Sequence, residues 1–392
     1  MQPGNDFSQF WSLDPAFTFL NHGSFGACPI AVLEVQQELR SRLERQPLRF
    51  LGREFEALLD QSRQSLAAFV GASVDELVFV PNATTGVNSV LRSLTFSPND
   101  ELLTTSQEYN ACRNALDFVA ARSGATIVVA EIPYPIESPH QVIEAVLSKV
   151  TDRTRLALID QVVSQTGLVF PIAQIVQALS ERGIETLIDG AHAPGMLALN
   201  LAEIGATYYS ATCHKWMCAP KGAAFLYVKK QKQAEIRPLT ISHGANSPRR
   251  DRSRFHLEFD WMGTTDPTAY LCVPSAIEFM QSLLPGGWTE LMQRNRATAI
   301  AARNSLCEKL NVAPPCPEAM IGSLATIPLP DGSYLELQDA LYEKYNIEVP
   351  IVPFPQPPNR LVRISAQLYN TAEQYEYLGN SLLTLIGSKF SQ

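Results

Sequence analysis

The hydrophobic pattern at the start of the chain predicts two amphipathic helices. Apolar residues recur every three or four positions between Ile30 and Gln46, and the same spacing returns between Phe55 and Phe69. A repeat of this length gathers the apolar side chains on one face of a helix, and that face packs against a core. We therefore expect two helices ahead of the first strand.

From residue 77 onward, short runs of β-branched and aromatic residues alternate with stretches of helical spacing. Helices that cover a sheet are expected at residues 142–147 and 172–179. This alternation predicts an α/β fold whose large domain holds a mostly parallel, seven-stranded sheet, and ligands bind such sheets at the carboxyl ends of the strands. The predicted strands are Leu77–Val80, Glu101–Thr105, Ile127–Ile132, Leu156–Asp160, Glu185–Ile188, Ala206–Tyr209 and Ala224–Val228.

The pattern changes beyond residue 275. A long helical segment runs towards Leu310, prolines interrupt the chain at Pro314–Pro317, and short strands and helices follow. We predict an N-terminal segment (1–17), a large domain (18–275) and a smaller C-terminal α/β domain (276–392). The proline-rich stretch Pro350–Pro358 is expected to form an extended loop, because proline at this density precludes helix.

Composition narrows the partner to a small molecule. The chain has 392 residues, of which 46% are hydrophobic, so it can bury a large core. Its net charge of -8 argues against a nucleic-acid partner, because such proteins concentrate basic residues on one face. The basic stretch Arg249–Arg254 is interpreted as a solvated loop, with attraction of an anionic substrate or cofactor as the alternative.

The cysteines and the N-terminus bear on the cellular compartment. Seven cysteines, without CxxC pairing or interleaved histidines, support neither a disulfide framework nor a metal site, so we expect no metal. Met1–Asp6 shows no secretory pattern, and no apolar run reaches membrane-spanning length, so no membrane partner is expected. The predicted location is the cytoplasm.

A lysine and an aspartate suggest the chemistry. Lys215 follows an apolar run in the segment Ser210–Trp216, and Asp189 ends the predicted strand before it. A lysine after a strand can form a Schiff base with an aldehyde cofactor, and a strand-end carboxylate can hold a pyridinium nitrogen. Each residue alone has an ordinary structural explanation, but together they suggest pyridoxal phosphate.

Other strand ends carry groups that suit the same cofactor. The small-residue turn Asn82–Gly86 opens a helix directly after a strand, where free amides and the helix dipole can hold a phosphate; a plain helix cap is the alternative. Tyr109 offers a flat ring that can lie against a heterocycle. Ser164 and His192 are polar groups that can contact a ring hydroxyl, although an ordinary turn and a structural histidine explain them as well.

The order of these motifs resembles that of class V aminotransferases, a superfamily of fold type I pyridoxal phosphate enzymes. The opening motif Leu20–Gly26 is most similar to the isopenicillin N epimerase-like branch, so the resemblance covers nearly the whole chain. It implies the fold type I transferase architecture, a large domain with a mostly parallel seven-stranded sheet and a smaller C-terminal α/β domain. The other motifs that carry it are Asn82–Gly86, Asp189–His192, Thr212–Trp216, Trp261–Asp266 and Val362–Ser365.

The resemblance implies a role for each matching residue. Lys215 would bond covalently to the cofactor, Asp189 would pair with the pyridine nitrogen, and Tyr109 would stack on the ring. Arg363 would grip the α-carboxylate of an amino-acid substrate, with Asn21 and His22 of the opening motif also at the substrate. The remaining cofactor contacts fall to the phosphate group (Ala83, Thr84, Thr212, His214), to the phenolic oxygen (Ser164, His192) and to a second subunit (Thr264), which implies a homodimer with shared active sites.

The reaction would begin with removal of the substrate α-proton by the Lys215 amine, with Asp189 and His192 as the other catalytic residues. Reprotonation on the opposite face would give epimerisation, and His22 or Tyr109 could be the second base. Elimination would make the protein a cysteine or cystine C–S lyase, and reprotonation at the cofactor would make it an aminotransferase. The alternative of a non-catalytic module on the same fold is disfavoured because Lys215 and Asp189 are both present.

A cysteine desulfurase is a less favoured outcome. Desulfurases of this superfamily carry a cysteine on a mobile loop upstream of the carboxylate-binding arginine, and residues 346–360 contain no cysteine. Cys316 lies earlier, between prolines that would make its loop rigid. The identity of the substrate amino acid is not predicted.

Overall fold

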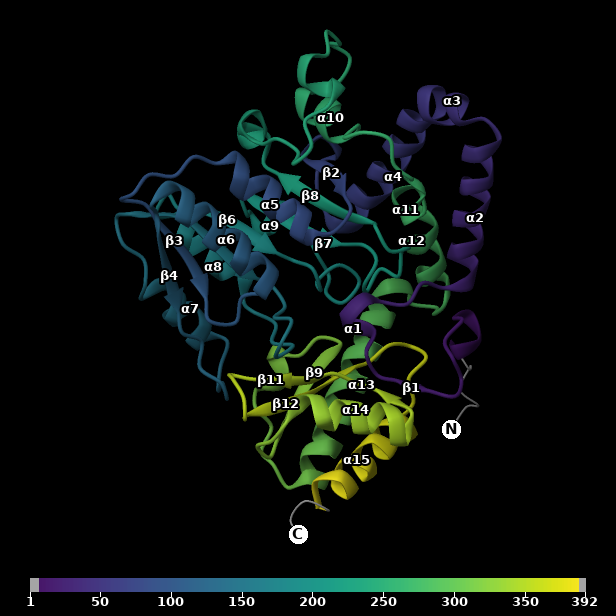
Figure 1. The fold of residues 1–392 in the computed structure, drawn as a ribbon, viewed down its shortest axis with the longest axis vertical. Coiled ribbons are helices and arrows are strands. Elements are labelled where there is room, and N and C mark those ends of the chain that lie inside the picture. The colour runs from purple at the N-terminus through teal and green to yellow at the C-terminus, as the bar shows by residue number, and fades with distance from the viewer. Residues whose placement is uncertain (1–6, 388–392) are drawn as a thin grey trace.

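A seven-stranded sheet forms the centre of the computed structural model, which describes residues 7–387 (Figure 1). The strand order is β2-β8-β7-β6-β5-β3-β4; only β8 runs antiparallel to its neighbours. All seven predicted runs lie in this sheet, so the predicted α/β architecture is confirmed. The strands are β2 (Leu77–Val80), β3 (Glu101–Thr105), β4 (Thr126–Ala130), β5 (Thr154–Asp160), β6 (Glu185–Asp189), β7 (Tyr208–Thr212) and β8 (Ala224–Val228).

Helices cover both faces of the sheet because their apolar stripes match its alternating side chains. One face packs against α5 (Ala83–Ser93) and α6 (Asn110–Ser123). The opposite face packs against the two helices predicted first, α2 (Ile30–Arg45) and α4 (Phe55–Val70), and against a second set of helices. That set is α7 (His140–Leu147), α8 (Ile172–Ser180) and α12 (Val273–Ser282).

The C-terminal part has a core of its own. Its antiparallel sheet has the order β11-β12-β9, and Figure 1 shows it below the large sheet with helices beside it. The elements are α13 (Gly287–Leu310), β9 (Leu324–Leu329), α14 (Tyr334–Tyr345), β11 (Ile351–Pro353), β12 (Arg360–Ser365) and α15 (Ala372–Gly387). The predicted long helix is therefore present, whereas the proline-rich stretch begins as strand β11, paired with β12, and forms a loop only from residue 354.

The chain start is tied to this C-terminal part. Strand β1 (Thr18–Phe19) pairs in parallel with β10 (Ile347–Glu348), and Leu20 lies in the C-terminal core. The predicted boundary at residue 275 falls inside α12, which packs on α2 and α4. The division into domains thus stays a prediction; residues 1–6 and 388–392 of its outer segments lie outside the described residues.

The remaining helices are short. Within residues 7–387, no helix combines the length and apolar character that a membrane span requires. The short α- and π-helices are α1 (His22–Phe25), α3 (Pro47–Arg49), η2 (Phe50–Glu54), α9 (Leu201–Ile204), α10 (Arg254–Phe259) and α11 (Thr268–Leu271). The short 3₁₀ helices are η1 (Phe7–Phe10), η3 (Val74–Glu76), η4 (Lys230–Glu235), η5 (His243–Asn246) and η6 (Glu318–Met320).

Two glycines allow close approaches that shape the region after β7. A Cβ on Gly26, whose φ is +71°, would lie 2.1 Å from the carbonyl oxygen of His214 and 2.9 Å from the Cα of Lys215. A Cβ on Gly86 would lie 2.1 Å from the Oγ of Ser210. The opening loop and the first turns of α5 therefore both press against the end of β7, which no larger residue would permit.

Candidate active site

Apart from Thr264, the residues proposed from the sequence gather around the carboxyl edge of the large sheet. Asp189 ends β6, its register partner Asp160 ends the neighbouring β5, and Lys215 comes three residues after the end of β7. Because β5, β6 and β7 are parallel neighbours, their carboxyl ends meet at one edge. The sheet thus brings Asp189 and Lys215 together although 26 positions separate them in the sequence.

The Lys215 amine lies against His192, with 3.2 Å between Nζ and Nε2. Burial lowers the pKa of Lys215 to about 8; the negative charge of Asp189 opposes this shift, and the positive charge of Arg363 adds to it. Burial and the Lys215 charge hold the pKa of His192 well below its usual range, so this ring is neutral. Trp216 Nε1 donates to His192 Nδ1 over 3.4 Å, which leaves the proton on Nε2, facing the lysine amine.

The Asp189 carboxylate is held by two donors. The Ala191 amide donates to Oδ1 over 2.9 Å, and the Cys112 thiol donates to Oδ2 over 3.0 Å. The side chain is 2% exposed, and burial raises its pKa, while both of these hydrogen bonds lower it. A positive partner such as a protonated pyridine nitrogen would favour the charged form of this carboxylate.

The start of α5 adjoins the end of β7, where the phosphate contacts were expected. The Asn82 side chain caps the Thr85 amide over 2.8 Å, so the amides of Ala83 and Thr84 stay without a partner in the helix. Ser210 on β7 donates to the Ala83 carbonyl over 2.9 Å, which ties the two elements together. Two residues complete this corner: Thr212 Oγ1 donates to the Ala191 carbonyl over 2.6 Å, and His214 Nδ1 lies 2.9 Å from the Ala223 carbonyl.

Tyr109 presents its ring at the same edge. Its amide donates to Asp160 Oδ2 over 3.2 Å, and the residue is 42% exposed, whereas Asp160, Asp189 and Arg363 are buried. Burial and the charge of Asp189 raise the pKa of the phenol, whereas the charge of Arg363 lowers it. The phenol therefore lies within electrostatic reach of both the aspartate and the arginine.

Arg363 reaches this place from β12 in the C-terminal part. One guanidinium nitrogen donates to the carbonyl oxygen of Ser164 and lies 3.5 Å from the Ser164 hydroxyl, and the other donates to Ser24 over 2.9 Å. Its Nε is buried without a hydrogen-bond partner, and no carboxylate among residues 7–387 pairs with it. A buried guanidinium without an acidic partner is a site prepared for an anion.

The opening motif lies beneath and beside the lysine. His22 is fully buried, with Nδ1 2.8 Å from the Tyr369 hydroxyl and Nε2 3.1 Å from the Lys215 carbonyl oxygen. Both ring nitrogens thus contact protein groups, so the ring is placed to hold the Lys215 backbone in position. Asn21 accepts a hydrogen bond from Ser24 over 2.5 Å, so it lies one contact away from Arg363.

Thr264 does not join the other residues within one chain. It is exposed in the loop between α10 and α11, and no hydrogen bond in the described part of the chain links it to them.

Residues that sequence reasoning missed lie behind Asp189, namely Glu108, Cys112 and Asp160. The position of Cys112, three residues after Tyr109 on the helix that Tyr109 begins, was the signal that could have revealed it.

The arrangement fits pyridoxal phosphate. Lys215 supplies a desolvated amine for the aldehyde, and Asp189 supplies a fixed carboxylate for the pyridine nitrogen. The free amides of α5 with Thr212 and His214 supply a phosphate cradle, and the exposed ring of Tyr109 supplies a stacking surface. The orphan Nε of Arg363 leaves a buried cation for the substrate carboxylate.

Comparisons with known proteins agree with this geometry. The sequence model of the family described as Aminotransferase class-V matches residues 27–378. Isopenicillin N epimerase from Amycolatopsis lactamdurans is 34% identical over 391 residues, covering 95% of this chain and 96% of that protein. A probable chloroplastic L-cysteine desulfhydrase from Arabidopsis thaliana is 30% identical over 411 residues, covering 98% of this chain and 86% of that protein.

Solved structures share the fold. The complex of the cystine C-S lyase C-DES with its reaction product, cysteine persulfide, has a TM-score of 0.78 at 23% identity and covers 93% of this chain and 97% of that chain. The cysteine desulfurase CsdA from Escherichia coli has a TM-score of 0.79 at 18% identity, covering 97% of this chain and 98% of that chain. The whole described architecture is therefore that of known pyridoxal phosphate enzymes.

Proposed function

Since the chain belongs to the class V aminotransferase family and is a pyridoxal phosphate-dependent enzyme, we propose that it removes the α-proton of an amino acid and acts as an isopenicillin N epimerase-like enzyme. The observation that carries this proposal is the pairing of Lys215 with Arg363. A desolvated amine with a pKa of about 8 lies near a buried guanidinium that has no acidic partner. The first is a base, and the second is a receptor for the substrate carboxylate.

The chain's own residues divide the work. Pyridoxal phosphate, when bound, supplies an electron sink for the α-carbon of the substrate. Arg363 holds the α-carboxylate with its guanidinium, which Ser24 and Ser164 keep in place. Lys215 takes the α-proton on Nζ; with a pKa of about 8, roughly half of this amine is neutral at pH 8, against well under 1% for an ordinary lysine.

His192 and Asp189 assist without moving the α-proton. The Nε2 proton of His192 faces the Lys215 amine, so it favours the neutral base over the ammonium form. Asp189 places a carboxylate where a pyridine nitrogen would be protonated, with both of its oxygens oriented by donors. Reprotonation from the other face is assigned to Tyr109, because its phenol is partly exposed, whereas His22 is enclosed.

A C–S lyase acting on cysteine or cystine is the second candidate. The full-length relation to a probable L-cysteine desulfhydrase favours it. The loop after β11 contains no cysteine. Burial raises the pKa of the Cys316 thiol, which disfavours the thiolate that a persulfide relay needs. Transamination remains the third outcome of the same proton removal.

Amino acids incubated with holoenzyme in heavy water will distinguish these reactions. We expect α-deuterium to appear in both configurations of the substrate amino acid, because Lys215 removes the proton and the opposite face returns one. Chiral chromatography with mass spectrometry measures both quantities. Pyruvate with sulfide would replace the epimerase proposal by the lyase, and a keto acid with pyridoxamine phosphate would replace it by transamination.

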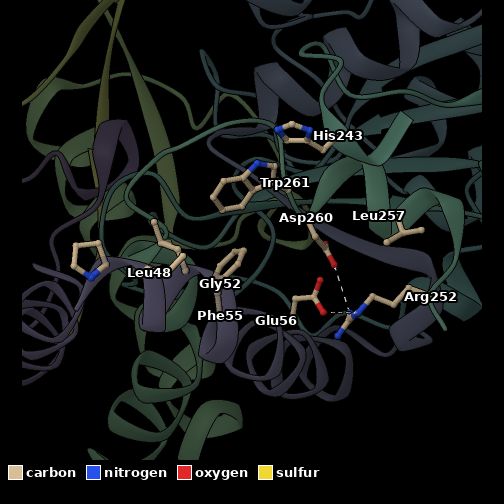
Figure 2. A pocket seen from close by; sticks show the side chains of 11 residues that line it. Leu48, Gly52, Phe55, Glu56, His243, Arg252, Leu257, Asp260 and Trp261 are labelled. Atoms are coloured by element: carbon tan, nitrogen blue, oxygen red, sulfur yellow. Dashed lines mark ion pairs between the residues drawn. The ribbon is translucent and has the colours of Figure 1, made fainter. Parts of the chain in front are cut away.

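We further propose a homodimer with shared active sites. A cavity of about 620 Å³ lies beside the loop that carries Thr264. Figure 2 shows Leu48, Phe55 and Trp261 among the side chains that line it. Leu48 is 80% exposed, and an exposed apolar surface next to a residue expected to serve another subunit favours a second copy as its cover. Arg252 at the rim is paired with Glu56 and Asp260, which supports the view that the basic stretch is a solvated, ion-paired loop.

Mixed dimers test whether the sites are shared. Lys215→Ala and Thr264→Glu should each inactivate, the second because it sets a negative charge against the phosphate. Random reassociation of the two variants should restore about a quarter of wild-type activity, since half of the dimers would hold one intact site. The matched control is Thr265→Glu, a neighbouring exposed threonine. Mixtures that stay inactive would show that each chain builds its own site.

The location and the domain boundaries complete the proposal. All seven cysteines are unpaired, which supports a reducing compartment such as the cytoplasm. We propose the division into residues 1–17, 18–275 and 276–392. The small C-terminal domain then supplies Arg363 to the site at the edge of the large domain.

A further inference from the structure

One buried ionisable group beside the site has no part in the proposed mechanism. Glu108 lies in the turn between β3 and α6 and is 7% exposed. Its Oε2 accepts only a long hydrogen bond from Thr104 Oγ1, at 3.4 Å, and its Oε1 is buried without any partner. No lysine or arginine within residues 7–387 forms an ion pair with it. A carboxylate in this setting lacks what stabilises a buried charge.

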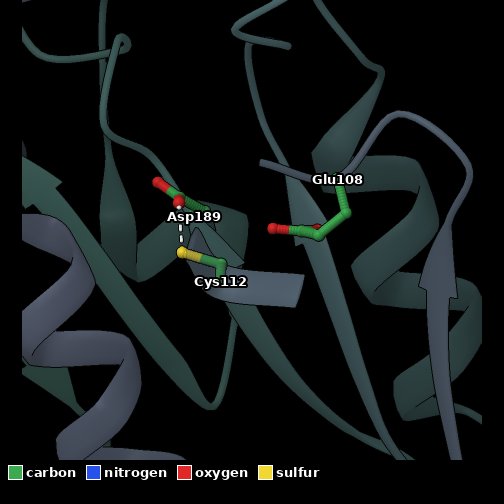
Figure 3. A group of neighbouring side chains, drawn as sticks. All are labelled: Glu108, Cys112 and Asp189. Carbon is green, nitrogen blue, oxygen red and sulfur yellow. Dashed lines mark hydrogen bonds between the residues drawn. The ribbon is translucent and has the colours of Figure 1, made fainter. Parts of the chain in front are cut away.

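Glu108 faces the carboxylate assigned to the cofactor. Figure 3 shows its carboxyl group directed toward Cys112 and Asp189. One carboxyl oxygen of Glu108, the Cys112 sulfur and one carboxyl oxygen of Asp189 all lie within 4.8 Å of one another. The Cys112 thiol already donates to Asp189, so Glu108 is the third member of a small buried group behind the pyridine position.

The hydrogen bonds decide which carboxyl keeps a proton. Two donors hold Asp189, and the Tyr109 amide donates to Asp160 over 3.2 Å. The long contact from Thr104, the Tyr109 backbone and the Arg113 charge lower the pKa of Glu108, each by less than burial raises it. Neighbouring carboxyls in one buried volume do not all ionise, and the one with the poorest donors is neutral. Burial and then the charge of Asp189 raise the pKa of Glu108 well above its usual range.

We propose that Glu108 is a neutral carboxylic acid in the working enzyme and is a positioning residue that keeps the negative charge of this group on Asp189. An ionised Glu108 would repel the Asp189 carboxylate and favour its protonation, and the bond to the pyridine nitrogen would lose its charge. The titratable and charged groups that face Glu108 or its partners are Tyr109, Cys112 and Arg113 around the start of α6, Asp160 on β5, Asp189 on β6 and Lys215 after β7.

Infrared difference spectroscopy of the holoenzyme tests the proton directly. At about pH 8 exposed carboxyls are ionised, so a band from a protonated carboxyl reports a buried acid. We expect wild-type protein to show such a band and Glu108→Gln to lack it. The same variant should keep the pH midpoint of the cofactor absorption and stay within roughly threefold of wild-type activity, because glutamine is neutral and similar in shape.

Asp160→Asn locates the proton even if Glu108→Gln does not fold. This variant should retain the band, and its loss would move the proton to Asp160 and overturn the proposal. In Glu108→Gln, a shift of roughly one pH unit or more in the midpoint of the cofactor absorption would also overturn the proposal. A shift of that size is expected only if the substitution removes a full negative charge close to the cofactor site.

The role assigned to Glu108 rests on the assignment of Asp189 to the pyridine nitrogen, but its protonation does not. If the protein failed to bind pyridoxal phosphate, the proposed function would fall, while the infrared comparison on the same protein would still decide the state of Glu108. If the protein binds pyridoxal phosphate but Glu108→Gln keeps the infrared band, the inference about Glu108 is rejected while the proposed function stands.

Discussion

Lys215→Ala is expected to remove the covalent cofactor bond and to lower the rate of α-proton exchange by roughly 10⁴-fold, the upper end for a positioned general base. The Lys215 amine is buried, and the Nε2 proton of His192 faces it. Absorption spectra and mass spectrometry of the borohydride-reduced protein will report the bond, and α-deuterium incorporation will report the exchange.

Two comparisons make the Lys215 result specific. Lys230→Ala removes an exposed lysine, paired only with Asp75 at 3.6 Å, and should leave both readouts at the wild-type level. Methylamine added to Lys215→Ala should restore part of the exchange, because alanine leaves room for a small amine beside His192. If the alanine variant kept a reducible bond at another lysine, the assignment of Lys215 would be rejected.

The positions of Asp189 and Lys215 were predictable because they depend on local rules. Alternating apolar and helical stretches specify a parallel sheet, and a residue at the end of one of its strands must lie at the carboxyl edge. The register of β6 beside β5 and β7 then brings those ends together. The hydrophobic pattern thus predicts the edge at which both residues lie, and the order of the strands makes them neighbours.

The position of Arg363 was not predictable in that way. Its contacts with Ser164 and Ser24 join residues 199 and 339 positions away, and only the packing of the C-terminal part on the sheet brings them together. Resemblance to a family suggested its role, while the chain's pattern alone offered no reason. His22 has the same origin, since its partner Tyr369 lies 347 positions away.

Glu108 and Cys112 were missed for a different reason. Both lie near Tyr109, the residue that the sequence offered as a stacking ring. A cysteine near the start of a helix is ordinarily a packing residue. Their importance lies in the direction of two side chains relative to the end of β6. The sequence specifies that α6 begins after β3, but not that Cys112 Sγ comes within 3.0 Å of Asp189 Oδ2.

Asp189→Asn is expected to lower the rate of α-proton exchange by about 10²–10³-fold, as loss of one preorganised electrostatic group does. Asparagine keeps the size of the side chain and an acceptor for the Ala191 amide, which Asp189 binds over 2.9 Å. It cannot balance a proton on a pyridine nitrogen, so the electron sink weakens while the pocket stays intact. Stopped-flow exchange rates, with the cofactor dissociation constant measured separately, will separate the two effects.

The neighbouring strand offers the matched control for this substitution. Asp160 is the register partner of Asp189, is equally buried and also ends its strand, but its carboxylate binds the Tyr109 amide. Asp160→Asn should therefore cost about tenfold or less, since asparagine can still accept that hydrogen bond. Equal losses of activity in the two variants would mean that either buried negative charge has the same effect, wherever it lies at this edge of the sheet. A large loss confined to Asp189 would tie the chemistry to the one carboxylate whose two oxygens are both oriented, and whose charge Glu108 would protect by remaining neutral.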